Sequence, residues 1–314
     1  MKSESAPTDT VAEKSALLAS LREYFELTKP RVVALIVFTA VVGMFLATPG
    51  MVPIEILVFA TIGIGLAAGS AACINHILDQ HVDGIMQRTK KRPLPMGQLS
   101  TRQAAIFSVI TGLIAMVILV WKVNLLTTVL TFASLVAYSI IYTMYLKRAT
   151  PQNIVIGGAA GAAPPVLGWT AVTGEISADA LLLFLIIFVW TPPHFWALAL
   201  YRELDYAKVG IPMLPVTHGN DFTRLHILLY TVVLFAVTIM PFATKMSGWF
   251  YLIGMIPLNV VFVYYAWKLY RQYSDQLARR TFIYSIQYLA LIFGLLLLDH
   301  YVIFITEALQ SAFY

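Results

Sequence analysis

Apolar stretches of about 20 residues recur along the whole chain of 314 residues, and they restrict the fold more than any other feature. A helix of that length crosses a hydrocarbon core of ~30 Å. Of all residues, 59% are hydrophobic and 12% are charged, about half the charged share of an ordinary soluble domain. Unpaired backbone groups are not tolerated in lipid, and continuous apolar runs lack the alternation of barrel strands. The sequence therefore predicts an all-α, polytopic membrane protein.

The breaks between apolar runs predict nine transmembrane helices around a central cavity. We expect the spans near residues 31–49, 53–76, 103–121, 124–146, 152–173, 179–200, 225–244, 249–270 and 282–304. Residues 1–30 are polar, show no removable signal peptide and are expected to form a cytoplasmic N-terminal segment. Residues 31–314 are expected to form one transmembrane domain. Two polar connections, 79–101 and 201–224, carry most of the side chains suited to chemistry.

The distribution of basic residues provides an independent test of this topology, because Lys and Arg gather in cytoplasmic loops. With the N-terminus inside, all of the 21 Lys and Arg residues except Lys122 and Lys245 fall on the same side. Both polar connections then face the cytoplasm. The net charge of +5 is explained by topology and requires no nucleic-acid partner. Because the N-terminal segment does not resemble a transit peptide, we expect a bacterial inner membrane.

Asn75, Asp79 and Asp83 stand at positions i, i+4 and i+8 at the end of the second predicted span, and we call them the acidic ladder. On a helix they fall within about 80° of one another and extend about 12 Å along the axis. Carboxylates at membrane depth are costly and usually face a cavity with a partner. Mg²⁺ is a natural partner, because it is often held by one or two carboxylates together with substrate phosphates. A ladder of this length could serve two ions that bridge a diphosphate.

Basic residues follow the acidic ladder directly, in the segment Arg88-Thr89-Lys90-Lys91-Arg92. Taken alone, this cluster is simply a signal of cytoplasmic topology. Acidic ladder and basic cluster together provide the metal ligands and cations that a diphosphate leaving group requires. The second polar connection, Tyr201 to Pro215, again sets an acid and bases at the end of a span and closes with prolines. It is interpreted as the second half of the same site.

These motifs resemble those of the UbiA superfamily of intramembrane prenyltransferases, which combine a nine-helix fold with two Asp-rich motifs. The acidic ladder matches the first motif, Asn-x-x-x-Asp-x-x-x-Asp, at every position. In the second motif, Asp-x-x-x-Asp, Asp205 matches the last aspartate, but Tyr201 stands in place of the first. This departure leaves open the ligand set of a second metal ion, for which Glu203 is a candidate substitute.

Finer features resemble the branch of this superfamily that acts on protoheme. They comprise Thr28 to Arg31, Asn75 to Pro95, Asn153 to Trp169, Thr191 to Trp196 and Gly210 to Pro215. The resemblance implies transfer of a farnesyl group from farnesyl diphosphate to a vinyl group of protoheme IX (heme B) with addition of water, giving heme O and diphosphate. Magnesium would be the cofactor, and direct handover of the product to a downstream heme-modifying enzyme or oxidase subunit is left open.

Candidate site residues follow from the motifs and the resemblance together. We expect Asn75, Asp79, Asp83 and Asp205 to be catalytic metal ligands. The residues expected to contact the diphosphate are Arg31, Arg88, Arg92, Tyr142, Lys147, Arg202 and Lys208, of which Tyr142 and Lys147 rest on the resemblance. His194 is expected to contact heme, because it lies within a span among Pro192, Pro193, Phe195 and Trp196. A hydrogen bond from His194 to another helix is the alternative.

Small residues are concentrated in two spans, Gly63 to Gly69 and Gly157 to Ala163. Close helix packing is the simpler interpretation of these stretches, and the close approach of a bulky ligand is the alternative. Pro164 and Pro165 are expected to bend or break the fifth span where it lines a cavity.

Two other functions are compatible with parts of the sequence. One is a prenyltransferase of the same superfamily that acts on an aromatic quinone precursor such as 4-hydroxybenzoate. The segments Pro192 to Trp196 and Gly157 to Pro165 argue against this acceptor. The other is an ion or solute transporter, since carboxylates within the membrane also form ion pathways. Product chromatography with each acceptor separates the two enzymes, and ion flux in proteoliposomes tests the transporter.

Overall fold

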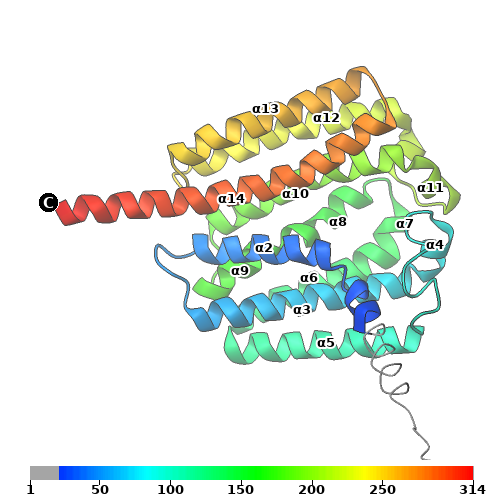
Figure 1. Cartoon of the computed structure of the whole chain (residues 1–314), viewed down its shortest axis with the longest axis horizontal. Coiled ribbons are helices and arrows are strands. Elements are labelled where there is room, and N and C mark those ends of the chain that lie inside the picture. The colour runs from blue at the N-terminus through cyan, green and yellow to red at the C-terminus, as the bar shows by residue number, and fades with distance from the viewer. Residues whose placement is uncertain (1–20, 314) are drawn as a thin grey trace, which may run out of the picture.

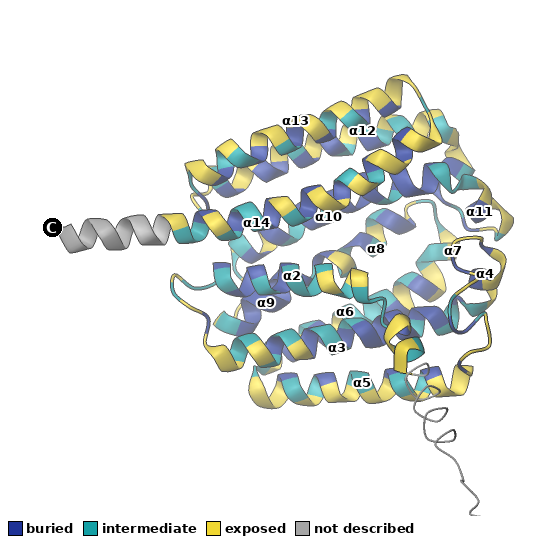
Figure 2. Cartoon of the chain, viewed as in Figure 1, coloured by how far each residue is buried: buried dark blue, intermediate teal, exposed yellow. Residues whose placement is uncertain are grey.

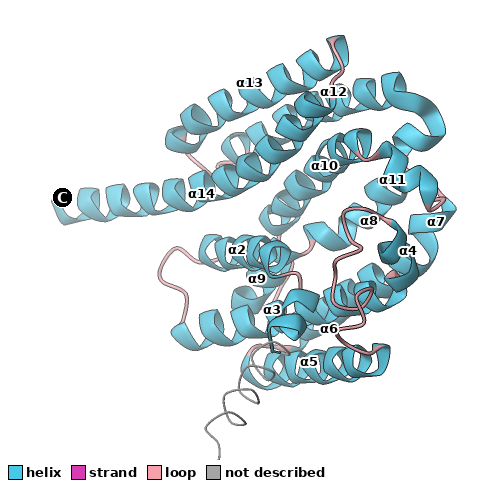
Figure 3. Ribbon diagram, turned by 45° about the vertical axis from the view of Figure 1, so that its right-hand side comes forward, coloured by secondary structure: helices cyan, strands magenta, loops and turns pink. Residues whose placement is uncertain are grey.

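The computed structural model describes residues 21–313, and it describes side chains as far as Val302. Within these residues the chain forms helices and loops and no strand (Figure 3). A short helix over Leu21–Leu27 comes first. The elements that follow are α2 (Pro30–Leu46), α3 (Ile54–Leu78), α4 (Gln80–Ile85), α5 (Thr101–Lys122), α6 (Leu125–Val136), a π-helix η1 (Ala137–Leu146), α7 (Lys147–Ala149), α8 (Asn153–Ala162), α9 (Pro164–Thr173), α10 (Ala178–Tyr201), α11 (Glu203–Lys208), α12 (Leu214–Ala243), α13 (Trp249–Arg271) and α14 (Asp275–Phe313).

Eight helical segments of the described chain are long and apolar enough to cross a membrane. A ninth is obtained when Leu21–Leu27 and α2, which meet at a bend of 57°, are taken as one span. The predicted all-α membrane fold is confirmed, and the predicted nine spans agree with this count. Of the expected N-terminal segment, residues 1–20, which include Lys2 and Lys14, lie outside the described residues.

The outer surface of the bundle is apolar where the helices face outward. α5 and α13 carry continuous exposed faces in Figure 2, and the exposed side chains of α5 include Ile106, Val109 and Leu113. α10 instead lies inside the bundle, packed against α8, α9, α12 and α14. Exposed apolar side chains would be unfavourable in water but are suited to lipid, so this pattern marks an integral membrane protein.

Breaks in the helices follow from proline and glycine. α8 ends at Ala162 and α9 begins at Pro164, where the missing proline N–H would have had no helical partner in any case. The predicted break at Pro164 is therefore confirmed. The predicted connection over 201–224 was too long, because α12 already begins at Leu214. Its helix is interrupted only at Gly219, whose φ of 81° is favourable for glycine alone.

Close helix packing explains most of the small residues. Where α2 crosses α9, a Cβ on Gly168 would lie 1.9 Å from the carbonyl oxygen of Ala40, and one on Gly43 would lie 2.3 Å from that of Pro165. Gly161 differs, because a Cβ at this position would meet no atom within 4 Å. Within the two predicted stretches, a Cβ on Gly63 would lie 2.7 Å from the side chain of Leu119, and one on Gly158 would lie 3.1 Å from that of Thr191. Packing therefore accounts for these two glycines, while Gly161 borders open space.

Replacing Gly168 with alanine should destabilise the protein, because the backbone of Ala40 cannot rotate away from the new methyl group. We expect a loss of about 1–3 kcal/mol, the usual cost of overpacking. Thermal unfolding of the detergent-purified protein measures this effect. Gly161→Ala is the matched control and should leave the unfolding temperature within about 1 °C, because alanine is well tolerated in helices. Equal unfolding temperatures for the two variants would contradict the role of the α2–α9 crossing.

Candidate active site

The acidic ladder is present in the folded protein, although the helix that carries it is interrupted. α3 ends at Leu78, and Asp79 takes φ −93° and ψ 1° before α4 begins. Backbone hydrogen bonds nevertheless continue in helical register, from Asp79 N to Asn75 O (3.0 Å) and from Asp83 N to Asp79 O (2.8 Å). The three ladder residues are 5%, 3% and 3% exposed, in chain order. Their side chains therefore lie inside the protein and do not face lipid.

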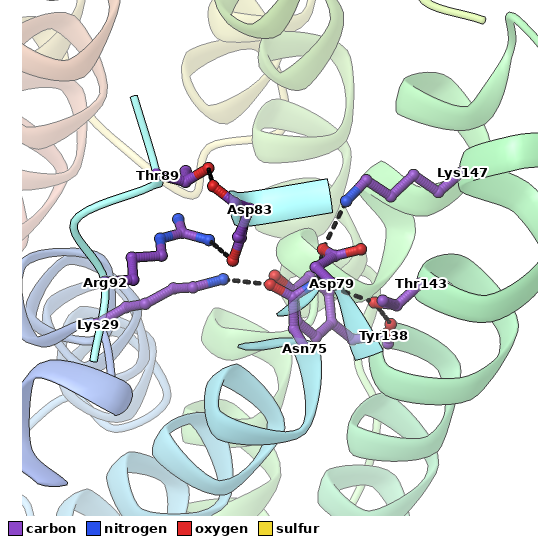
Figure 4. Close-up of polar contacts among 9 residues, drawn as sticks. All are labelled: Lys29, Asn75, Asp79, Asp83, Thr89, Arg92, Tyr138, Thr143 and Lys147. Carbon is purple, nitrogen blue, oxygen red and sulfur yellow. Dashed lines mark hydrogen bonds and ion pairs between the residues drawn. The ribbon is translucent and has the colours of Figure 1, made fainter. Parts of the chain in front are cut away.

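Each ladder residue contacts a cation from a different part of the chain (Figure 4). The Lys29 ammonium donates to Oδ1 of Asn75. Lys147 Nζ lies 2.5 Å from Oδ2 of Asp79, and Arg92 Nη1 lies 2.5 Å from Oδ2 of Asp83. Three cations thus converge on two carboxylates and one amide. Such a cluster can exchange its internal pairs for an anionic ligand.

Further hydrogen bonds fix the orientation of the ladder. Asn75 Nδ2 donates to Asp79 Oδ2 (2.9 Å) and to Thr143 Oγ1 (3.2 Å). Thr143 belongs to the π-helix η1, where its hydroxyl donates to the carbonyl of Tyr138 at 2.8 Å. On the other side, Thr89 Oγ1 donates to the carbonyl oxygen of Asp83 (3.0 Å). Single turns of π-helix are frequent at functional sites, and here η1 brings a hydroxyl to the ladder.

The side-chain oxygens of the ladder fit a hard divalent cation. Asp79 Oδ1 is buried and has no hydrogen-bond partner, which leaves a carboxylate oxygen free to act as a ligand. Within residues 21–302, no three His, Cys, Asp or Glu side chains are close enough to form a ready-made metal site. Asp205 therefore does not join Asp79 and Asp83 in one closed set. Mg²⁺ commonly completes its shell with substrate phosphates and water, so an open set of oxygens is suitable.

The second polar connection lies at the same end of the bundle as the first. Asp205 is buried in α11, and its Oδ2 lies 3.6 Å from Nη1 of Arg202. α4, α7 and α11 lie at the same end of the bundle in Figures 1 and 3. The two connections share one apolar cluster, to which the first contributes Val82 and the second Tyr206. Asp205 thus lies at the same end of the molecule as the ladder, in a neighbouring acid–base pair.

The structure brings only some of the predicted diphosphate contacts to the ladder. Arg92 and Lys147 bind it directly, and Tyr142 belongs to η1, where the absent side chain of Gly157 leaves room for its ring. Arg88, Lys208 and Arg31 are exposed, and no ion pair involves them within the described residues.

Lys29 was not among the predicted site residues, yet its side chain reaches the ladder where that of Arg31 does not. Its φ of 52° places it at the bend before α2, with the side chain turned inward. A basic residue directly before Pro30 was visible in the sequence, but its direction depends on this bend. Thr143 was also missed, because a threonine within an apolar span carries no distinctive signal.

His194 is buried in α10, among aromatic rings. Its ring stacks on Trp190 (centroids 4.2 Å apart) and on Phe282 (4.7 Å), and its Nδ1 lies 2.7 Å from Oγ of Ser285. The hydrogen bond to another helix that was the alternative interpretation is therefore present. It occupies Nδ1, and within the described residues Nε2 has no hydrogen bond. His76 is also buried, with both ring nitrogens unpaired, whereas His81 is exposed.

Comparison with known proteins extends these observations. The model of the UbiA prenyltransferase family matches residues 36–296. A protoheme IX farnesyltransferase of Nitrosospira multiformis is 62% identical over 284 residues, covering 90% of this chain and 95% of that protein. The corresponding protein of Nitrosomonas europaea is 60% identical over 286 residues, covering 91% of this chain and 96% of that protein.

Solved structures show the same fold at low sequence identity. A structure of digeranylgeranylglyceryl phosphate synthase has a TM-score of 0.75 at 18% identity and covers 90% of this chain and 98% of its own. A homologue from Archaeoglobus fulgidus bound to GPP and Mg²⁺ has a TM-score of 0.61 at 15% identity and covers 87% of this chain and 99% of its own.

Proposed function

The chain belongs to the UbiA prenyltransferase family, and we infer that it transfers a farnesyl group from farnesyl diphosphate to a vinyl group of protoheme. Water is added in the same reaction, and the products are heme O and diphosphate. The observation that best supports this function is the buried ladder with its three converging cations, in a chain 62% identical to a protoheme IX farnesyltransferase.

Residues around the ladder can hold the diphosphate through charge. Lys29, Arg92 and Lys147 are bound to Asn75, Asp83 and Asp79 and can turn to phosphate oxygens, which form short charge-assisted hydrogen bonds with such groups. Asn75, Asp79 and Asp83, with Asp205 on the neighbouring connection, would hold Mg²⁺. When bound, the ion supplies positive charge that neutralises the leaving diphosphate.

Chemistry then follows from stabilisation of the leaving group. The bond between the farnesyl C1 and the diphosphate oxygen breaks, its electron pair stays on the diphosphate, and cationic character develops on the allylic carbon. Lys29, Arg92 and Lys147 stabilise the charge that builds up on the departing oxygens. The vinyl group attacks C1 with its π electrons, and water quenches the cation next to the porphyrin ring, releasing a proton. The apolar helices exclude water from the allylic carbon before that attack.

The proposed location follows from the apolar helices and the bacterial relatives. The protein is integral to a membrane, and bacterial relatives support a plasma membrane. We place the N-terminus and both polar connections on the cytoplasmic side of a bacterial inner membrane, because the basic residues gather there. Heme O would pass from this site to a downstream heme-modifying enzyme or oxidase subunit.

A product assay tests the function directly. Membranes containing the protein, incubated with protoheme, farnesyl diphosphate and Mg²⁺, should form heme O, identified by chromatography and by its added farnesyl and hydroxyl mass. Membranes without the protein and reactions without farnesyl diphosphate serve as controls. Prenylation of 4-hydroxybenzoate in place of protoheme would instead assign the quinone-precursor reaction. Absence of any prenylated product, with ion flux in proteoliposomes, would assign a transporter.

A further inference from the structure

A cavity of about 600 Å³ opens between the end of α10 and the first turns of α14, apart from the acidic ladder. Its wall includes Tyr201, Arg202, Asp275, Arg279 and Phe282. The volume lies within the range of small-molecule sites, roughly 300–1,000 Å³. No residue of the acidic ladder lines it.

The cavity is positively charged, and its arginines retain binding capacity. Arg202 and Arg279 line it, and together with Arg88 they act electrostatically on the Tyr201 hydroxyl. Nε of Arg202 is buried without a hydrogen-bond partner. Arg279 pairs with no carboxylate in the described part of the chain. Arg279 is thus available to a carboxylate of a ligand, whereas Arg202, which pairs with Asp205 at 3.6 Å, can add a contact through its remaining N–H groups.

Asp275, the acidic residue in the cavity wall, already has a hydrogen-bond partner. Asp275 Oδ1 accepts a hydrogen bond of 2.6 Å from the Tyr273 hydroxyl. Burial, and then this bond, raise the pKa of Tyr273 above its ordinary value, so the hydroxyl stays protonated as a donor. Asp275 therefore has a partner other than the arginines, and within the described residues it forms no ion pair with Arg202 or Arg279.

Aromatic rings lead from the cavity into the membrane interior. Phe282 lines the cavity, meets the ring of Tyr201 edge-on at 6.2 Å, and stacks on His194 at 4.7 Å between centroids. His194 in turn stacks on Trp190 at 4.2 Å. The cavity thus combines arginine side chains with aromatic rings. This combination suits a flat, apolar molecule that carries carboxylates on one edge.

We propose that this cavity binds the propionate edge of protoheme, with Arg202 and Arg279 holding the carboxylates and the rings of Tyr201 and Phe282 contacting the porphyrin. The assignment rests on the proposed function. Protoheme carries its two propionates on one edge and its vinyl groups on the opposite edge, so this binding directs a vinyl group away from the cavity mouth.

The proposal also explains two neighbouring features. Arg202, in the cavity wall, lies 3.6 Å from Asp205, so the cavity adjoins the second polar connection. Tyr201 occupies the position at which the second motif lacks its first aspartate. A carboxylate at this position would compete with the propionates for Arg202 and Arg279. An uncharged tyrosine adds no such competitor.

Heme titrations of the full-length protein in phosphatidylcholine nanodiscs test this site. The ligands are protoheme and its dimethyl ester, which has the same ring but no carboxylates, and binding is followed by Soret absorption. We expect wild-type protein to bind protoheme about tenfold more tightly than the ester. Arg279→Gln should raise the Kd for protoheme about tenfold and leave the Kd for the ester unchanged. Arg279→Lys, which keeps the charge, should raise the Kd for protoheme by a smaller factor.

Arg280→Gln is the matched control, because Arg280 is the exposed neighbour that does not line the cavity. An unchanged KM for farnesyl diphosphate in Arg279→Gln shows that the diphosphate site is intact. The proposal is overturned if wild type does not discriminate between acid and ester, or if Arg279→Gln binds protoheme like Arg280→Gln. A second set of nanodiscs contains phosphatidylglycerol, and the proposal is also overturned if Arg279→Gln loses bound phosphatidylglycerol while its Kd for protoheme is unchanged, which would assign the arginines to lipid headgroups. Failure of wild type to make heme O would refute the proposed function, whereas normal heme O synthesis with unchanged heme affinity in Arg279→Gln would refute only this site.

Discussion

Replacing Asp79 with asparagine should lower heme O formation about 10³-fold, equivalent to about 4 kcal/mol of transition-state stabilisation. Asp79 is buried, binds Lys147, accepts from Asn75 and keeps one oxygen free. Asparagine retains the shape but removes the charge that would hold a cation at the leaving group. It also leaves the Lys147 ammonium without its counter-charge, which is costly in a buried site. Initial rates of heme O formation, normalised to folded protein, measure the effect.

Asp221→Asn is the matched control for this substitution. The Asp221 side chain is 90% exposed and also pairs with a basic residue, Arg224, so the variant removes an ion pair outside the site. Surface pairs contribute little to stability, and its activity should equal that of wild type. An Asp79→Asn protein that eluted as folded and retained more than a tenth of the activity would be incompatible with the proposed role of the ladder.

Local sequence patterns were sufficient to predict the ladder and most of the fold. Length and hydropathy determine where a helix crosses lipid, so the spans could be located from the order of residues alone. The spacing of Asn75, Asp79 and Asp83 is a property of one helix and needs no tertiary information. Their shared burial and helical register follow from that spacing, even though α3 ends at Leu78.

The partners of the ladder could not be predicted in the same way. Lys29 lies 46 positions and Lys147 lies 68 positions from the residues that they contact, and no local periodicity connects such distant segments. The bend before α2 and the π-helix η1 decide which side chains reach the site, and both depend on packing against other helices. For the same reason, Lys29 was overlooked in favour of Arg31.

The cavity between α10 and α14 could not be predicted from the sequence either. Tyr201 and Arg279 are far apart along the chain and meet only because α14 packs against α10. In the sequence, Tyr201 stood out as a departure from a motif. In the structure, the same residue lies beside guanidinium groups in the wall of a cavity.

Chelating divalent cations should reduce farnesyl transfer by at least about 10³-fold. The negative charges of Asp79 and Asp83 are neutralised within the protein, because each carboxylate is bound to a cation. A diphosphate that takes Lys147 and Arg92 from these carboxylates would leave two buried anions without counter-charge, which costs several kcal/mol for each ion. Mg²⁺ would remove this cost, so chelation should weaken farnesyl diphosphate binding as well as stop the reaction.

The two effects can be separated by measurement. Heme O formation is followed in membranes treated with EDTA, and binding of farnesyl diphosphate is followed by equilibrium dialysis under the same conditions. Treatment with EDTA already saturated with Mg²⁺ is the matched control and should leave both unchanged, since this complex cannot remove metal. Added Mg²⁺ should restore activity after chelation, whereas Ca²⁺ should restore less, because it prefers a larger and more flexible oxygen shell. Full transfer in excess EDTA would mean that Lys29, Arg92 and Lys147 stabilise the leaving group without a metal ion.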